Sequence, residues 1–186
     1  LPFFLITVSS YAQNVEKVSI LGNKRITDES IKVLGNIDIP SDKSISHRSI
    51  IIPSISRGIS EINNLLISDD VMHTLNAFKS LGVKIEKSND KIIIYGKGLT
   101  SLKKPNKNIY LGNSGTSARL LTGLLASQNF ETILEGDRSL SSRPMARIID
   151  PLKLMGAKFE NNTGTLPLKI IGKNLYKSKI EIKIPS

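Results

Sequence analysis

The sequence predicts a mixed α/β (α+β) fold built from a repeated β-α-β-α-β-β unit. Helical and strand-like apolar patterns follow one another in the same order twice, in residues 37–95 and again in residues 108–171. Short segments also recur at matching places: residues 81–86 (LGVKIE) match residues 155–160 (MGAKFE), and Tyr95-Gly96-Lys97 matches Ile171-Gly172-Lys173. Duplication of one supersecondary unit explains both observations.

The first copy contains two predicted helices. We expect a strand at residues 37–39, a helix at 44–56, a strand at 59–65, a helix at 70–81, and a hairpin of strands 83–87 and 91–95. Pro53 lies inside the first of these helices. It should kink that helix or end it early, because proline removes a backbone hydrogen bond.

The second copy follows a turn-rich linker at residues 97–107. We expect a strand at residues 108–111, a helix at 114–127, a strand at 130–135, a helix at 145–155, and hairpin strands at 157–161 and 166–171. Pro144 should stand in the first turn of the last helix, where proline is tolerated. Strict alternation in residues 179–184 predicts the first strand of a third copy, and we interpret the stop at Ser186 as a truncation.

The composition fits one domain and limits its chemistry. Hydrophobic residues make up 39% of the 186 residues, enough for a core. The net charge of +10 favours acidic partners such as phosphorylated metabolites, nucleic acid or acidic lipids, and a lysine-rich solvated surface is the alternative reading. With no cysteine and two histidines, we expect no disulfide, no metal site and no cofactor. The apolar run at residues 1–8 is far shorter than the roughly 18–20 residues that span a membrane.

Two stretches, residues 41–48 and 111–119, place small hydroxyl or glycine residues just before a predicted helix, with an arginine in its early part. Free backbone N–H groups, hydroxyl donors and a fixed cation at such a place favour anion binding. Lys43 and Arg48 are otherwise unfavourable at a helix start, where the dipole disfavours cations. The alternative is that Ser44 or Ser46 serves only as a helix cap.

The second stretch supplies Asn113, Gly115, Thr116 and Arg119. Gly115 permits a close approach of backbone to ligand, although a tight turn with a cap would have the same residues. The stretch lacks the Gly-Lys-Ser/Thr ending of a nucleotide-binding P-loop. Two such stretches predict a ligand or ligands with more than one acidic group.

Three further polar positions receive separate interpretations. Arg143 precedes the last predicted helix, as a third anion-binding side chain or as surface charge. Asp69 and Asp70 are interpreted as acids that stabilise a helix start. His47 is interpreted as a packed or surface residue and not as a catalyst.

Residues 42–49, 113–119 and 136–155 resemble, in that order, the N-terminal part of 5-enolpyruvylshikimate-3-phosphate (EPSP) synthases of the bacterial class II type. The resemblance covers residues 37–186 and implies the enolpyruvyl transferase inside-out barrel, here as two units plus the start of a third. It further implies transfer of the enolpyruvyl group of phosphoenolpyruvate to the 5-hydroxyl of shikimate 3-phosphate. The expected protein is a cytoplasmic, monomeric transferase of the shikimate pathway, on the way to chorismate and the aromatic amino acids.

The resemblance also implies roles for individual residues. Lys43 would be catalytic and contact both substrates, while Ser44, Arg48 and Ser186 would bind shikimate 3-phosphate. The phosphoenolpyruvate side would be lined by Asn113, Gly115, Thr116, Arg119 and Arg143. The acid–base carboxylates of the family would lie beyond Ser186, so the chain alone is expected not to turn over. Ser41 departs from the family, which has glycine there.

The N-terminal residues indicate a different origin. Residues 1–13 resemble the end of a truncated signal peptide, and residues 14–36 resemble the opening of a POTRA domain from an outer-membrane assembly factor. We interpret the chain as a chimeric reading frame joined near residue 37, with a divergent native extension as the alternative.

Two other functions remain as alternatives. A related UDP-N-acetylglucosamine enolpyruvyl transferase would carry a Lys-Asn signature where Lys43-Ser44 stands, and a cysteine that this chain lacks. A basic nucleic-acid-binding module would fit the charge, but aromatic residues are only 5% of the chain and no nucleic-acid-binding motif is present. We therefore expect small-molecule ligands, with neither nucleic acid nor membrane as a partner.

Overall fold

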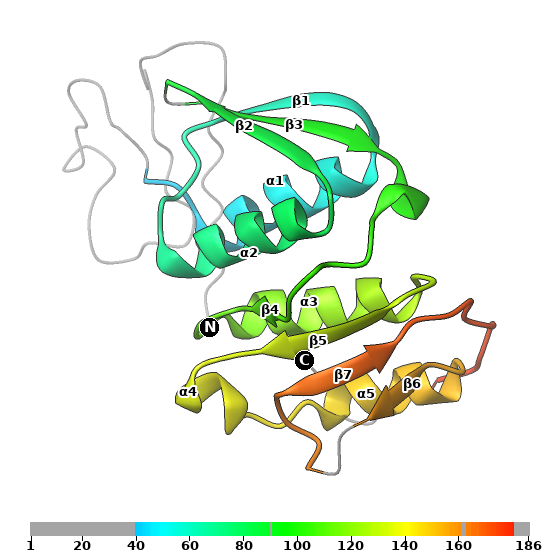
Figure 1. The fold of residues 1–186 in the computed structure, drawn as a ribbon. Coiled ribbons are helices and arrows are strands. Elements are labelled where there is room, and N and C mark those ends of the chain that lie inside the picture. Colours follow the sequence, from blue (N-terminus) through cyan, green and yellow to red (C-terminus); the bar gives the residue numbers. More distant parts are fainter. Residues whose placement is uncertain (1–39, 90, 161–162, 181–186) are drawn as a thin grey trace, which may run out of the picture. The chain divides into compact units, whose positions relative to one another are not determined.

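The computed structural model describes residues 40–89, 91–160 and 163–180 (Figure 1). Apart from Pro40, these residues belong to one compact unit, residues 41–186. The expected strand at residues 37–39, the signal-like and POTRA-like segments, and Ser186 lie outside the described residues. So does most of the strand expected at residues 179–184, whose first two residues have no regular structure.

The first copy folds into two helices and a three-stranded sheet. Its elements are α1 (Lys43–Ile55), β1 (Arg57–Asn63), α2 (Asp69–Ser80), β2 (Lys84–Ser88) and β3 (Lys91–Lys97). The strands pair antiparallel in the order β1-β3-β2. Ile92 and Ile94 of β3 are buried among the apolar residues of the core, whereas Lys91 and Lys97 at the two ends of the strand are exposed. A short 3₁₀ helix, η2 (Leu99–Ser101), leads into the linker.

The second copy repeats this arrangement and adds elements to it. It comprises β4 (Ile109–Tyr110), α3 (Gly115–Ala126), β5 (Glu131–Glu135), α4 (Arg138–Ser141), α5 (Ala146–Leu154), β6 (Lys158–Glu160) and β7 (Leu168–Ile171). The sheet order is β4-β5-β7-β6, in which β4 and β5 are parallel and the other neighbours antiparallel. Because β5-β7-β6 reproduces the order β1-β3-β2, the predicted mixed α/β fold with a duplicated unit is confirmed (Figure 1).

The matched glycines of the two copies, Gly96 and Gly172, lie in the same structural position, against the backbone at the end of a helix. A Cβ at Gly96 would meet the backbone carbonyl oxygens of Pro53 and Ser56, at the end of α1. A Cβ at Gly172 would meet those of Leu125 and Gln128, at the end of α3. In each copy the end of the first helix therefore lies directly against the end of the strand that comes last in the chain, β3 or β7. This close approach explains why glycine recurs there.

The start and end of α1 differ from the expectation. Asp42 caps the helix, its Oδ1 accepting from the Ile45 N–H at 2.7 Å, so the cap is neither Ser44 nor Ser46. The Ser46 hydroxyl is buried instead and accepts from the Leu66 N–H at 3.1 Å. The helix continues past Pro53 to Ile55, and the Pro53 carbonyl accepts from the Ser56 N–H at 3.2 Å, so the helix does not end early at Pro53.

Differences in the second copy centre on the loop before α5. Met145 is the N-cap of α5, and its N–H donates to the Gly164 carbonyl at 2.8 Å, so Pro144 lies ahead of the helix and not in its first turn. The short helix α4 was not expected from the sequence. Asp137 caps it by accepting from the Leu140 N–H at 2.7 Å, and Leu140 is buried beneath it.

The close approach at Gly96 can be tested by substitution. Gly96→Ala is expected to lower the free energy of unfolding by about 1–3 kcal/mol, because the new methyl group collides with fixed carbonyl oxygens. Gly123→Ala is the matched control, since a Cβ there meets nothing within 4 Å and alanine is favoured inside α3 by up to about 1 kcal/mol. Urea unfolding of the 186-residue chain measures both, and equal effects would contradict the packing described.

Candidate anion-binding site

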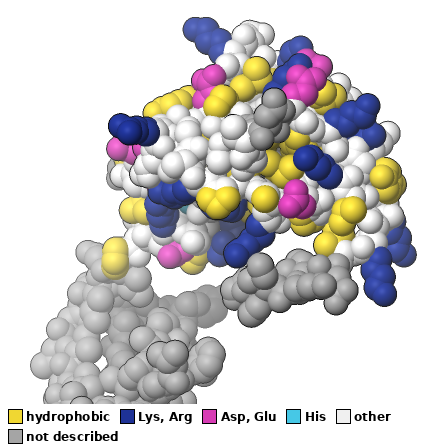
Figure 2. Space-filling view, turned by 90° about the horizontal axis from the view of Figure 1, so that it is seen from below, with side chains coloured by type: hydrophobic (Ala, Val, Ile, Leu, Met, Phe, Trp, Pro, Cys, Tyr) yellow, Lys and Arg dark blue, Asp and Glu magenta, His cyan; other side chains and the backbone are white. Residues whose placement is uncertain are grey.

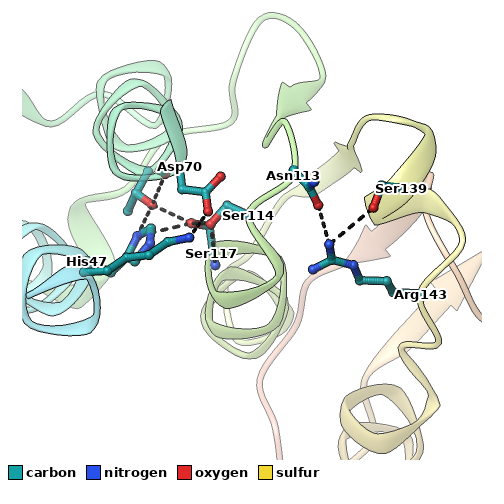
Figure 3. A network of polar contacts seen from close by, with 9 residues as sticks. His47, Asp70, Asn113, Ser114, Ser117, Ser139 and Arg143 are labelled. Carbon is teal, nitrogen blue, oxygen red and sulfur yellow. Dashed lines mark hydrogen bonds and ion pairs between the residues drawn. The ribbon is translucent and has the colours of Figure 1, made fainter. Parts of the chain in front are cut away.

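The parallel strands β4 and β5 bring two polar loops together. Their carboxyl ends lie at the same edge of the sheet, the usual position of ligand sites in such sheets. The loop after β4 carries Asn113, and the loop after β5 leads through α4 to Arg143. Arg143 Nη2 donates to Asn113 Oδ1 at 2.5 Å and to Ser139 Oγ at 3.3 Å (Figure 3). The structure thus joins two residues that the sequence placed in the same site.

Two guanidinium groups flank Gly115 at the first position of α3. Arg119 Nη1 donates to the Gly115 carbonyl oxygen at 3.1 Å. A Cβ built on Gly115 would lie 2.8 Å from Arg119 Nη1 and 3.1 Å from Arg143 Nη1. In the described residues, neither guanidinium forms an ion pair with a carboxylate. Two cations beside the positive end of a helix dipole repel it, so the arrangement favours a bound anion.

Lys43 is the first residue of α1 and forms an ion pair with Asp70, in the first turn of α2. The Lys43 side chain is 52% exposed and that of Asp70 is 20% exposed. Asp70 therefore does more than stabilise its own helix start, a contact that the sequence analysis missed. Ser44 and Arg48, also in α1, are exposed, and Thr116 is half-buried in α3.

A buried polar network connects the two loops. His47 Nδ1 lies 2.8 Å from Thr74 Oγ1, which lies 2.5 Å from Ser117 Oγ, which in turn lies 2.6 Å from Ser114 Oγ. All four side chains are at most 1% exposed, and they come from α1, α2 and the start of α3 (Figure 3). Burial lowers the pKa of His47, and nearby Lys43 lowers it further, against the opposing effect of Asp70. Of the two environments considered for His47, packed or surface, the structure shows the packed one, and the lowered pKa favours the neutral imidazole at neutral pH.

Charged side chains of both signs lie on the surface of the chain. Figure 2 shows Lys and Arg side chains spread over the face seen from below, with Asp, Glu and apolar side chains among them. A groove of about 500 Å³ lies beside α1 and β1 and includes Ser41 and Asp42 at the start of α1, but none of the predicted anion-binding cations lines it. No described helix is long and apolar enough to cross a membrane. The described residues also contain no cluster of three His, Asp or Glu that could hold a metal ion.

A duplicated α/β scaffold with cations gathered at helix starts has the features of a site for small, multiply charged anions. The sequence model of the EPSP synthase (3-phosphoshikimate 1-carboxyvinyltransferase) family matches residues 27–186. The chain therefore belongs to this family. The chimeric junction near residue 37 stays a prediction. So does the division of the preceding residues into a signal-like and a POTRA-like segment.

Individual relatives agree with the family match. The chain is 51% identical over 150 residues to the 3-phosphoshikimate 1-carboxyvinyltransferase of Vesicomyosocius okutanii, covering 81% of this chain and 34% of that one. It is 53% identical over 139 residues to that of Oenococcus oeni, covering 74% and 32%. The EPSP synthase structure from Acinetobacter baumannii superposes with a TM-score of 0.77 at 42% identity, covering 81% and 35%. The chain spans about a third of the length of the relatives it matches.

The neutral, buried state of His47 predicts a pH dependence of stability. Its pKa in the folded chain lies below the ordinary value of 6.5, so the folded state binds fewer protons than the unfolded state. Protonation of His47 therefore favours the unfolded state. It leaves the free energy of unfolding unchanged above pH 6.5 and lowers that free energy as the pH falls below 6.5. Urea unfolding at several pH values should show this loss, and His47→Leu should reduce it. An unchanged slope in the variant would contradict the assignment.

Proposed function

We propose that the chain is part of an enzyme that transfers the enolpyruvyl group of phosphoenolpyruvate to the 5-hydroxyl of shikimate 3-phosphate, releasing phosphate. The observation that carries this proposal is the pair of guanidinium groups, of Arg119 and Arg143, beside Gly115 at the start of α3. The two substrates together bring two phosphates and two carboxylates, which match a site of this charge. Family membership and the names of the relatives support the same reaction.

The second loop is proposed to bind phosphoenolpyruvate. Arg143 and Arg119 would hold its acidic groups, and the absence of a side chain on Gly115 makes room for both guanidinium groups at the start of α3. Asn113 orients Arg143 through its amide oxygen, and the Thr116 hydroxyl is available as a further donor. As phosphate leaves, these fixed donors would stabilise the charge that develops on it.

The start of α1 is proposed to bind shikimate 3-phosphate. Lys43, Ser44 and Arg48 lie within little more than one turn of this helix, with Lys43 held by Asp70. Lys43 would also contact phosphoenolpyruvate and act at the reacting hydroxyl, where an ammonium group stabilises developing negative charge. Ser186 completes the proposed shikimate 3-phosphate set and lies outside the described residues.

The cellular setting belongs to the same proposal. We infer a cytoplasmic monomer that acts in the shikimate pathway on these two small molecules, with neither nucleic acid nor a membrane as partner. This part rests on the family resemblance and on the small, anionic character of the substrates.

Calorimetric titration of the 186-residue chain with shikimate 3-phosphate tests the first half of the site. We expect saturable binding that Lys43→Ala and Arg48→Ala each weaken about tenfold or more, because each removes a charge-assisted hydrogen bond. Lys79→Ala, at the exposed end of α2, is the matched control and should bind as the parent does. Failure of a folded chain to bind, or equal losses in all three variants, would contradict the proposal.

The second half of the site is tested with phosphoenolpyruvate in the presence of shikimate 3-phosphate. Arg143→Ala should weaken its binding about tenfold or more, since the guanidinium beside Gly115 is lost. Arg138→Ala removes an exposed arginine from α4 and serves as the control for net charge. If both variants lose the same affinity, the effect is one of overall charge and the assignment of Arg143 is wrong.

A further inference from the structure

His47 is a buried group that the proposed substrate contacts do not use. Its side chain is 0% exposed, although it stands directly before Arg48 and one turn after Lys43. Its Nε2 has no hydrogen-bond partner among the described residues, whereas Nδ1 is bonded. Burying a polar atom without a hydrogen-bond partner costs free energy. The burial of this ring, which is bonded at Nδ1 alone, therefore needs an explanation.

The bond to Thr74 aligns α1 with α2. Lys43 pairs with Asp70, and four residues further along each helix His47 bonds to Thr74. The Lys43–Asp70 ion pair is partly exposed, and in the proposed function Lys43 binds the substrates. An exposed ion pair is weak and screened by salt, so the buried contact one turn deeper is the one that keeps the two helices in register.

From Thr74 the network continues to the second loop. Thr74 Oγ1 lies 2.5 Å from Ser117 Oγ, and Ser117 Oγ lies 2.6 Å from Ser114 Oγ. Ser114 is the N-cap of α3 and accepts from the Ser117 N–H at 3.3 Å. The network ends at Ser114, whose backbone neighbours are Asn113, the partner of Arg143, and Gly115 (Figure 3). The hydrogen bonds therefore reach from the helix of Lys43 to the backbone of the loop that contacts Arg143.

Either tautomer of His47 is compatible with this network. With the proton on Nδ1, the imidazole donates to Thr74, whose hydroxyl donates to the Asp70 carbonyl oxygen at 3.3 Å. With the proton on Nε2, the Thr74 hydroxyl donates to Nδ1 instead. In both cases the short polar contact of the imidazole is made at Nδ1, and the amide group of an asparagine, which carries both a donor and an acceptor, can make it from nearly the same place.

We propose that His47 is a positioning residue whose Nδ1 edge holds the cation-bearing start of α1 against the start of α3. The inference rests on the function proposed above, because it concerns the spacing of the two substrate loops. The imidazole touches neither substrate and acts through Thr74, Ser117 and Ser114. Its Nε2 edge is dispensable.

The test compares two substitutions at this position in the 186-residue chain, titrated with shikimate 3-phosphate under conditions where circular dichroism shows each variant folded. His47→Leu removes the polar contact at Nδ1 and should weaken binding about tenfold. His47→Asn keeps a polar group at the Nδ1 position and should stay within about threefold of the parent. Ile170→Ala, a buried substitution in the second sheet outside the network, controls for loss of stability and should bind as the parent does.

Each outcome has a distinct meaning. Rescue by asparagine but not by leucine supports the positioning role. If His47→Leu binds as well as the parent while Lys43→Ala does not, the inference is overturned and the proposed function stands. If asparagine and leucine weaken binding equally, or Ile170→Ala weakens it as much as leucine does, His47 has only a structural role. If the folded parent does not bind, the proposed function itself is contradicted.

Discussion

The contact between Thr74 and Ser117 is the constraint on which the site depends. It is a buried hydrogen bond of 2.5 Å between the second helix of one copy and the first helix of the other. A satisfied polar contact in a core fixes one arrangement, because any slip would leave buried donors and acceptors without partners. The helix starts that carry Lys43 and Gly115 are thereby held next to each other, although the residues lie far apart in the sequence.

Duplication supplies one scaffold with two different sets of side chains. The first helix of each copy begins after a loop with a hydroxyl residue and carries a cation within it, and its last turn lies against a glycine at the end of the last strand in that copy. At the start of the second helix the copies differ in charge: Asp70 meets Lys43 in one copy, and Arg143, just before α5, meets Asn113 in the other. The first copy therefore holds Lys43 by an ion pair, while the second copy adds the guanidinium of Arg143 to the site.

Much of this fold follows from local patterns. Alternating and helical periodicities predicted both helices and the hairpin of each copy to within a few residues, and the repeated glycines marked the same packing contact twice. The residues of the second loop and Arg143 were also predicted as one site. The Asp42 cap and α4 were missed, because several residues near those helix starts could have served as caps. The contacts of Asp70, Thr74 and Ser117 could not be predicted, since they depend on how the two copies pack and not on spacing within either one.

The central claim is that the starts of α1 and α3 form a single anion-binding surface. The most direct measurement is the amide ¹H–¹⁵N spectrum of the isotope-labelled chain as shikimate 3-phosphate and then phosphoenolpyruvate are added. We predict that the amide resonances of residues 43–48 and 113–119 shift. Each group should respond to both ligands, because the buried network joins the two helix starts. Shifts scattered over the exposed lysines, or confined to one helix start with the other unaffected by either ligand, would contradict it.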